Sequence, residues 1–182
     1  MKMKGGIVSI ALTLMGFCAS SWAQEVHHEK ESRHSLGITI NHAHTFQGVN
    51  AQGKRQVLIL PMWGLDYNYR LSEKWWLGLH TDIIVETFEV QPFDKEGEES
   101  IRRTRPIAPA LMGFYTLNEH WKLGGGAGLE WSEEETFTLN RLAMEYAYPL
   151  AQGWELIGAV QYDLRWNAYD TWSLGLGVLM EL

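Results

Sequence analysis

Two histidines lie two residues apart, at positions 42 and 44, in a segment where a β-strand is expected. Because side chains at i and i+2 of a strand share a face, these two imidazoles could hold one transition-metal ion together. Two ligands do not complete the shell of a zinc site. His27, His28 and His34 are near in sequence, but they precede the expected strand. His42 and His44 lie towards the far end of that strand, too distant for the other histidines to complete the shell. The sequence therefore predicts no specific metal site and no cofactor, and His42 and His44 are left as candidates for adventitious binding.

A second group of chemically capable residues consists of charged side chains in segments where apolar and polar residues alternate. If these strands close into a narrow barrel, as argued below, charges on the inner face are costly unless they are paired. Their mixture of signs therefore indicates salt bridges that fill the interior of the barrel. The members of this predicted lumen network are Asp66, His80, Asp82, Glu86, Lys122, Glu130, Arg141, Glu145, Asp163 and Arg165.

Alternation with a period of two predicts the strands that position these charges. Trp63, Leu65 and Tyr67, for example, alternate with Gly64 and Asp66, so that large apolar residues share one face and charged or small residues share the other. The faces of the strand containing Pro106 and Pro109 stay unassigned. The expected strands cover about 35–46, 62–69, 77–86, 104–115, 122–131, 141–148, 156–165 and 171–182.

The pattern Y-x-L-x-x-x-W occurs three times, at 69–75, 115–121 and 148–154. Each copy has a polar or turn-forming centre and is flanked by alternating segments, as expected of a hairpin turn at a membrane surface. We expect these three copies to be short periplasmic turns. The sequence then predicts an all-β, eight-stranded, antiparallel, up-and-down transmembrane β-barrel with outer loops at 47–56, 89–102, 132–136 and 167–170.

Aromatic residues fall near both ends of the expected strands, and amphipathic aromatic rings favour membrane–water interfaces. The spacing of about 9 to 11 residues between the two belts fits a tilted strand that crosses a bilayer. The predicted lower belt contains Tyr69, Trp75, Trp76, Tyr115, Trp121, Tyr148 and Trp154, and the predicted upper belt contains Phe46, Phe88, Trp131, Phe137, Trp166, Tyr169 and Trp172.

The N-terminus has the features of a cleaved secretory signal peptide over 1–23: Lys2 and Lys4, an apolar region over 7–18, and a small-x-small site at 21–23. A polar periplasmic tail over 24–34 and the barrel over 35–182 would follow. The single cysteine, Cys18, lies in the removed segment, so the mature fold has no disulfide. A formal net charge of -7 argues against nucleic acid as a partner.

The last strand resembles the C-terminal signal that the outer-membrane assembly machinery recognises, with Gly177, Met180 and Leu182 at matching positions, although the final residue is usually aromatic. Over the mature length the chain resembles the small OmpA-like, OmpX-like and OmpW-like barrels of Gram-negative bacteria. The resemblance implies a packed polar interior and variable surface loops. The even number of strands and the short turns place both mature termini on the periplasmic side of the outer membrane, and we expect a monomer. Its partners would be outer-membrane lipid and the assembly machinery.

Fold alone does not select a function. We expect a non-enzymatic cell-envelope protein, porin-like only in architecture, with a structural or surface-interaction role through its outer loops and a ligand that the sequence does not identify. One alternative is a lipid-modifying enzyme, since some such barrels are lipid A deacylases with a His-x-Ser pair; the nearest arrangement here is His42-Ala43-His44-Thr45. A second is a small-solute or ion pathway, which an eight-stranded interior disfavours. A soluble lipocalin-like barrel, with apolar residues inside, is the competing fold.

Overall fold

The computed structural model describes residues 32–92 and 100–182. In these two ranges no helix is long and apolar enough to cross a membrane. The predicted signal peptide and most of the predicted tail lie outside the described residues. The strands are β1 (His34–Val49), β2 (Arg55–Arg70), β3 (Trp75–Ile84), β4 (Thr87–Val90), β5 (Ile101–Thr104), β6 (Ile107–Thr116), β7 (Trp121–Trp131), β8 (Thr136–Pro149), β9 (Trp154–Arg165) and β10 (Asp170–Glu181).

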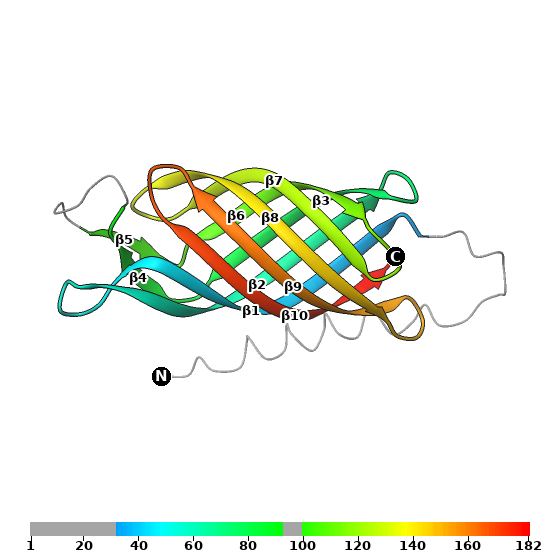
Figure 1. Cartoon of the computed structure of the whole chain (residues 1–182), viewed down its shortest axis with the longest axis horizontal. Helices are drawn as coiled ribbons and strands as arrows, with labels where there is room; N and C mark the ends of the chain where they lie inside the picture. Colours follow the sequence, from blue (N-terminus) through cyan, green and yellow to red (C-terminus); the bar gives the residue numbers. More distant parts are fainter. Residues whose placement is uncertain (1–31, 93–99) are drawn as a thin grey trace, which may run out of the picture. The chain divides into compact units, whose positions relative to one another are not determined.

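Eight of these strands close into a barrel in which every pairing is antiparallel (Figure 1). The order is β1-β2-β3-β6-β7-β8-β9-β10, and β10 pairs again with β1 from Ser35↔Glu181 to Thr45↔Thr171. Closure removes the free edges that would otherwise leave backbone N–H and C=O groups unpaired. The predicted eight-stranded antiparallel barrel is confirmed.

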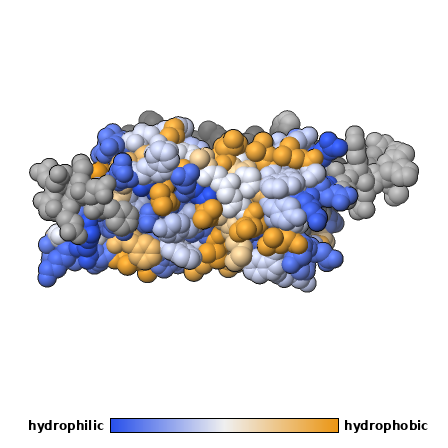
Figure 2. All heavy atoms as spheres, turned by 45° about the horizontal axis from the view of Figure 1, so that its top comes forward, coloured by the Kyte–Doolittle hydropathy of each residue, from blue (hydrophilic) through white to orange (hydrophobic). Residues whose placement is uncertain are grey.

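The wall of the barrel separates large apolar side chains from polar ones. Trp63, Leu79 and Leu129 are 43%, 49% and 40% exposed, whereas Asp82 and Arg141 are buried in the lumen. Figure 2 shows hydrophobic residues across the middle of one face of the wall and hydrophilic residues towards both ends. The predicted faces are confirmed within the barrel strands, with Glu86 beyond the end of β3 as the exception, and the inverse arrangement of a lipocalin-like barrel is contradicted.

All three copies of the Y-x-L-x-x-x-W repeat form tight turns, between β2 and β3, β6 and β7, and β8 and β9. In each copy the leucine N–H donates a hydrogen bond to the tryptophan carbonyl oxygen four residues later. The N···O distances are 2.9 Å for Leu71→Trp75, 2.8 Å for Leu117→Trp121 and 2.8 Å for Leu150→Trp154. The sequence pattern therefore encodes one hairpin geometry three times, at the end of the barrel where the C-terminus lies (Figure 1).

The opposite end differs from the sequence prediction. Strand β3 ends at Ile84, and the segments Thr87–Val90 and Ile101–Thr104, expected in part as a loop, pair as an extra hairpin, β4–β5. This hairpin joins β1 through the pair Gly48↔Val90. The predicted loop over 47–56 is also shorter, because β1 continues to Val49 after a register shift beyond Thr45. These changes extend the sheet beyond the barrel at this end (Figure 1).

Strand β6 contains Pro109, and part of its pairing with β7 is missing there. The β6–β7 pairing is interrupted between Ile107↔Trp131 and Ala110↔Gly128, where Pro109 has no N–H to donate. Ala108, Ala110, Met112 and Phe114 point inward, which assigns the faces that the sequence left open. Glycines on β7 allow β6 to approach closely: a Cβ on Gly126 would lie 2.1 Å from the Leu111 carbonyl oxygen.

Candidate functional site

The lumen near the β4–β5 end is organised around one buried carboxylate, Glu130. The Arg103 Nη2 donates to Glu130 Oε1 at 2.6 Å, and the Arg165 Nε donates to Oε2. The Tyr169 hydroxyl donates to Oε1 at 2.5 Å, and Arg103 also donates to the Glu135 carbonyl oxygen at 2.6 Å. Burial raises the pKa of Tyr169, so its hydroxyl stays protonated and remains a donor. Glu130 is thus a fully paired anchor for β5, β7, β9 and the β9–β10 turn.

An aromatic shell surrounds this anchor. The guanidinium of Arg103 lies 4.5 Å from the ring centroid of Phe137, and that of Arg165 lies 4.5 Å from Tyr169. Phe88 and Phe137 both pack edge-on against Tyr169. The prediction that these three aromatic residues belong to the upper membrane belt is wrong, because all three point inward and are buried. Rings stacked on guanidinium groups stabilise charges that have lost their water.

A second layer lies further along the lumen and centres on Arg141. Its guanidinium makes a bidentate contact with Asp163, with Nε–Oδ1 and Nη2–Oδ2 distances of 2.7 Å and 2.8 Å. The same guanidinium lies 2.7 Å from Asp82 Oδ2, which also accepts a hydrogen bond from the Gln161 amide at 2.5 Å. Arg165 Nη2 reaches Asp163 Oδ2 at 3.5 Å and joins this layer to the first. Arg141 therefore ties β8 to β9 and, across the lumen, to β3.

A third layer is centred on His80. Its Nδ1 lies 3.3 Å from Asp66 and 3.8 Å from Glu145, and its Nε2 lies 2.8 Å from the Asn68 side-chain oxygen. The ring packs against Phe114, with 4.9 Å between centroids. Since two carboxylates face one ring nitrogen, a proton must lie in this contact, on the imidazole or on a carboxyl group.

Lys122 and Glu86 are the two remaining members of the predicted lumen network. Lys122 is half-buried, and its Nζ lies 4.3 Å from the Trp76 ring centroid. Trp76, predicted in the lower belt, is 8% exposed and points into the lumen instead. Glu86 is exposed between β3 and β4, so the prediction that it faces the lumen is wrong. The alternation that carried this prediction stops where β3 ends, at Ile84.

Little free space remains between the second and third layers. A small cavity of about 20 Å³ lies there, lined in part by Asn41, Asp66, His80, Glu145 and Gln161. A cavity needs at least about 10–15 Å³ to hold one water molecule. This cavity has room for a single water between the polar groups that line it.

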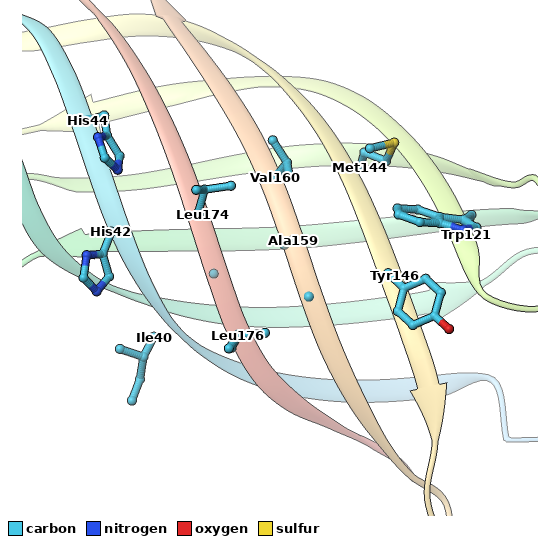
Figure 3. A pocket seen from close by; sticks show the side chains of 12 residues that line it. Ile40, His42, His44, Trp121, Met144, Tyr146, Ala159, Val160, Leu174 and Leu176 are labelled. Carbon is cyan, nitrogen blue, oxygen red and sulfur yellow. The ribbon is translucent and has the colours of Figure 1, made fainter.

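The two candidate metal ligands lie on the outside of the barrel. His42 and His44 project from the outer face of β1, where His42 is exposed and His44 half-buried (Figure 3). In residues 32–92 and 100–182, no group of three or more His, Cys, Asp or Glu side chains could hold a metal ion. Thr45, beside His44, points the other way, is fully buried and contacts Thr171 with 3.2 Å between the hydroxyl oxygens. The wall thus separates both histidines from Thr45, the hydroxyl next to His44 in sequence.

Apart from Trp76 and Tyr169, the tryptophans and tyrosines of the two predicted belts lie on the outer wall. Tyr69 and Tyr115 are half-buried, and Tyr115 packs edge-on against Trp75 at 5.0 Å between centroids. Their location at a membrane–water interface stays a prediction. The exposed members are Trp75, Trp121, Trp131, Tyr148, Trp154, Trp166 and Trp172.

Sequence reasoning missed Arg103 as a member of the lumen network. Arg103 lies directly after the expected outer loop 89–102, and it is fully buried while Arg102 is exposed. The signal was a short alternation over 101–104, too brief to indicate a strand without its partner over 87–90. Alternation places Asn68 and Gln161 on the lumen face, but the predicted network, which was built from charged and histidine side chains, did not include these two amides.

No family model matches the chain, and no curated protein matches it. Several solved structures are similar to it. Neisserial surface protein A is 11% identical, with a TM-score of 0.54 over 82% of this chain and 97% of that one. Ail, the attachment invasion locus protein of Yersinia pestis, is 14% identical, with a TM-score of 0.51 over 82% and 99%. The outer membrane protein OprG of Pseudomonas aeruginosa is 13% identical, with a TM-score of 0.51 over 86% and 100%. The chain therefore has the fold of the eight-stranded outer-membrane barrels.

Proposed function

We propose that this protein is a bacterial outer-membrane barrel with a closed lumen, and that its specific function is an interaction made at the end that carries β4 and β5. The observation that carries this proposal is the filled interior. Three layers of buried charged groups, centred on Glu130, Arg141 and His80, occupy the lumen. Buried charges that are each held by two or more partners are costly to separate, which disfavours passage of solutes.

The outer wall supports the membrane location. Large apolar residues cover the middle of the wall (Figure 2). Short hairpin turns connect the strands at one end, and the hairpin β4–β5 extends the sheet at the other end (Figure 1). Short periplasmic turns and longer extracellular loops are typical of outer-membrane barrels. By this rule the β4–β5 end faces the cell exterior and the C-terminus faces the periplasm.

The end that carries β4 and β5 presents charge of both signs. Lys54 and Arg55 lie at the β1–β2 turn, and Glu133, Glu134 and Glu135 lie between β7 and β8. Neisserial surface protein A and the attachment invasion locus protein bear names that refer to the cell surface and to attachment. An interaction at the cell surface is therefore the role that we assign to this end of the barrel.

Two alternative functions have less support. A solute pathway would need an opening among the paired charges of the lumen. A deacylase-like enzyme would need a base beside its nucleophile, whereas the outward His44 and the inward Thr45 lie on opposite sides of the wall.

Location and orientation can be tested with a matched pair of single-cysteine variants. Ala51→Cys lies in the exposed β1–β2 turn and Ala151→Cys in the exposed β8–β9 turn. A membrane-impermeant maleimide added to intact cells should label Ala51→Cys, and should label Ala151→Cys only after the outer membrane is permeabilised. Labelling of Ala151→Cys alone on intact cells would reverse the orientation, and loss of both proteins to a soluble fraction would refute the membrane location.

A further inference from the structure

His42 and His44 are polar groups on an otherwise apolar part of the outer wall. Within the described residues, neither imidazole has a hydrogen-bond or ion-pair partner. Each imidazole carries at least one N–H donor, and a donor taken out of water without an acceptor costs free energy. The residues paired with them on β2 and β10 are Ile59, Pro61, Trp172 and Leu174, and none of these side chains can accept a hydrogen bond. The described part of the barrel therefore supplies no acceptor for these two imidazoles.

The height of the two histidines on the barrel indicates where an acceptor outside the barrel would lie. His34 pairs with Tyr69 of the predicted lower belt, and His44 pairs with Trp172 of the predicted upper belt. Ten residues of β1 separate His34 from His44. At about 3.3 Å per residue and a tilt of about 40°, this distance is ~25 Å, the height of the apolar band of such barrels. His44 therefore lies at the edge of the hydrocarbon region, and His42 lies just inside it.

A shallow apolar groove begins at these histidines and runs across β10, β9 and β8 towards Trp121 (Figure 3). Its volume is about 760 Å³, and its floor includes Gly158. Gly158 pairs with Leu176 on one side and Tyr146 on the other, so the missing side chain leaves a depression between two large ones. An extended hydrocarbon chain fits the shape and the apolar lining of this groove.

We infer that His42, His44 and the groove bind a phosphate-bearing lipid of the surrounding membrane, with the phosphate at the imidazoles and an acyl chain along the groove. A phosphate group offers several acceptor oxygens, so both N–H donors can bond to one headgroup. A lipid supplies this acceptor at the same depth as the histidines, and its acyl chain covers the apolar lining below them. The inference rests on the proposed membrane location but not on the closed lumen.

The phosphate can be tested by native mass spectrometry of the detergent-purified barrel with two lipids that share their acyl chains. The probes are dioleoyl phosphatidic acid and dioleoylglycerol. We expect the wild-type protein to retain the phosphatidic acid about tenfold more strongly, which corresponds to about 1.4 kcal/mol. The double variant His42→Leu, His44→Leu should lose this preference. Thr81→Leu, which replaces an outward polar residue on β3 away from the groove, should keep it.

The groove can be tested with Gly158→Leu. A Cβ at this position would meet only the Leu176 side chain, at 3.7 Å, so the first atom of the new side chain fits and the rest fills the depression. We expect retention of phosphatidic acid to fall although both histidines remain; unchanged retention would contradict the groove as the acyl site.

Three results would overturn the inference: equal retention of both lipids by the wild type, a preference that survives in the double histidine variant, or a preference that EDTA abolishes, since the last would assign binding to a metal ion. A folded barrel that shows no lipid preference refutes this inference alone. A chain that folds and stays soluble without detergent refutes the membrane location as well.

Discussion

Replacing Arg141 by methionine should be strongly destabilising. Methionine keeps much of the aliphatic stem but removes the charge that bridges Asp163 and Asp82, which are 3% and 6% exposed. Removing one partner of a buried ion pair typically costs about 3–5 kcal/mol, because the other charge stays buried. Here Asp163 keeps Arg165 at 3.5 Å and Asp82 keeps the Gln161 amide, so we expect a cost near the lower limit, about 3 kcal/mol.

The assay is equilibrium unfolding of the barrel in lipid vesicles by urea, followed by tryptophan fluorescence. Arg102→Met is the matched control, because Arg102 is an exposed arginine on β5, and it should change the free energy of unfolding by less than about 0.5 kcal/mol. Adding Asp163→Asn to Arg141→Met should recover part of the loss, since it removes one of the uncompensated charges. A free energy of unfolding for Arg141→Met equal to that of the wild type would refute the assignment of Arg141 as the central tie of the lumen.

Three further predictions concern packing, the Glu130 anchor and pH. Gly126→Ala should lower the free energy of unfolding by about 1–3 kcal/mol, because the new Cβ would lie 2.1 Å from a backbone oxygen. The control Gly158→Ala should have little effect, because the nearest side chain lies 3.7 Å from its Cβ. Equal effects of the two substitutions would contradict the close approach of β6 and β7. Tyr169→Phe removes a 2.5 Å hydrogen bond to a carboxylate and should cost about 1.5–3 kcal/mol in the same assay, and an unchanged value would show that the hydroxyl does not support Glu130. Hydrogen bonds from the Ser132 and Thr104 hydroxyls lower the pKa of Glu134 from its usual 4.5 to about 2, so their stabilisation is present above pH 4.5 and is lost as pH falls towards 2. The protection factors of the β7–β8 turn amides, taken relative to the intrinsic exchange rate at each pH, should therefore fall over this pH range in the wild type and not in Glu134→Gln.

The sequence was sufficient to predict the regular part of the barrel. Alternation of apolar and polar residues indicates which face of a strand meets an apolar phase. Because a shift of one residue would move every side chain of the strand to the other face, ten or more residues all report the same assignment. The hairpin repeat was equally readable, because Leu71, Leu117 and Leu150 occupy the same place in the same hydrogen-bonded turn.

The β4–β5 end was predicted poorly, for physical reasons that concern short elements. A four-residue strand such as Ile101–Thr104 has too few positions to show a period, and its burial depends on its partner hairpin. The same limit explains Phe88, Phe137 and Tyr169. An aromatic residue near a strand end packs inward or outward according to tertiary contacts, and here the guanidinium groups of Arg103 and Arg165 provide the inward contacts.

The closed lumen is the central claim, and conductance across a planar lipid bilayer tests it most directly. The purified, folded barrel should insert without producing discrete conductance steps, while a general porin under the same conditions should produce them. Steps from the wild-type protein would contradict the claim if their size changes in Glu145→Gln, because that carboxyl group lies inside the lumen. Absence of such steps would leave the outer end and the outer wall of the barrel as the surfaces on which its function depends.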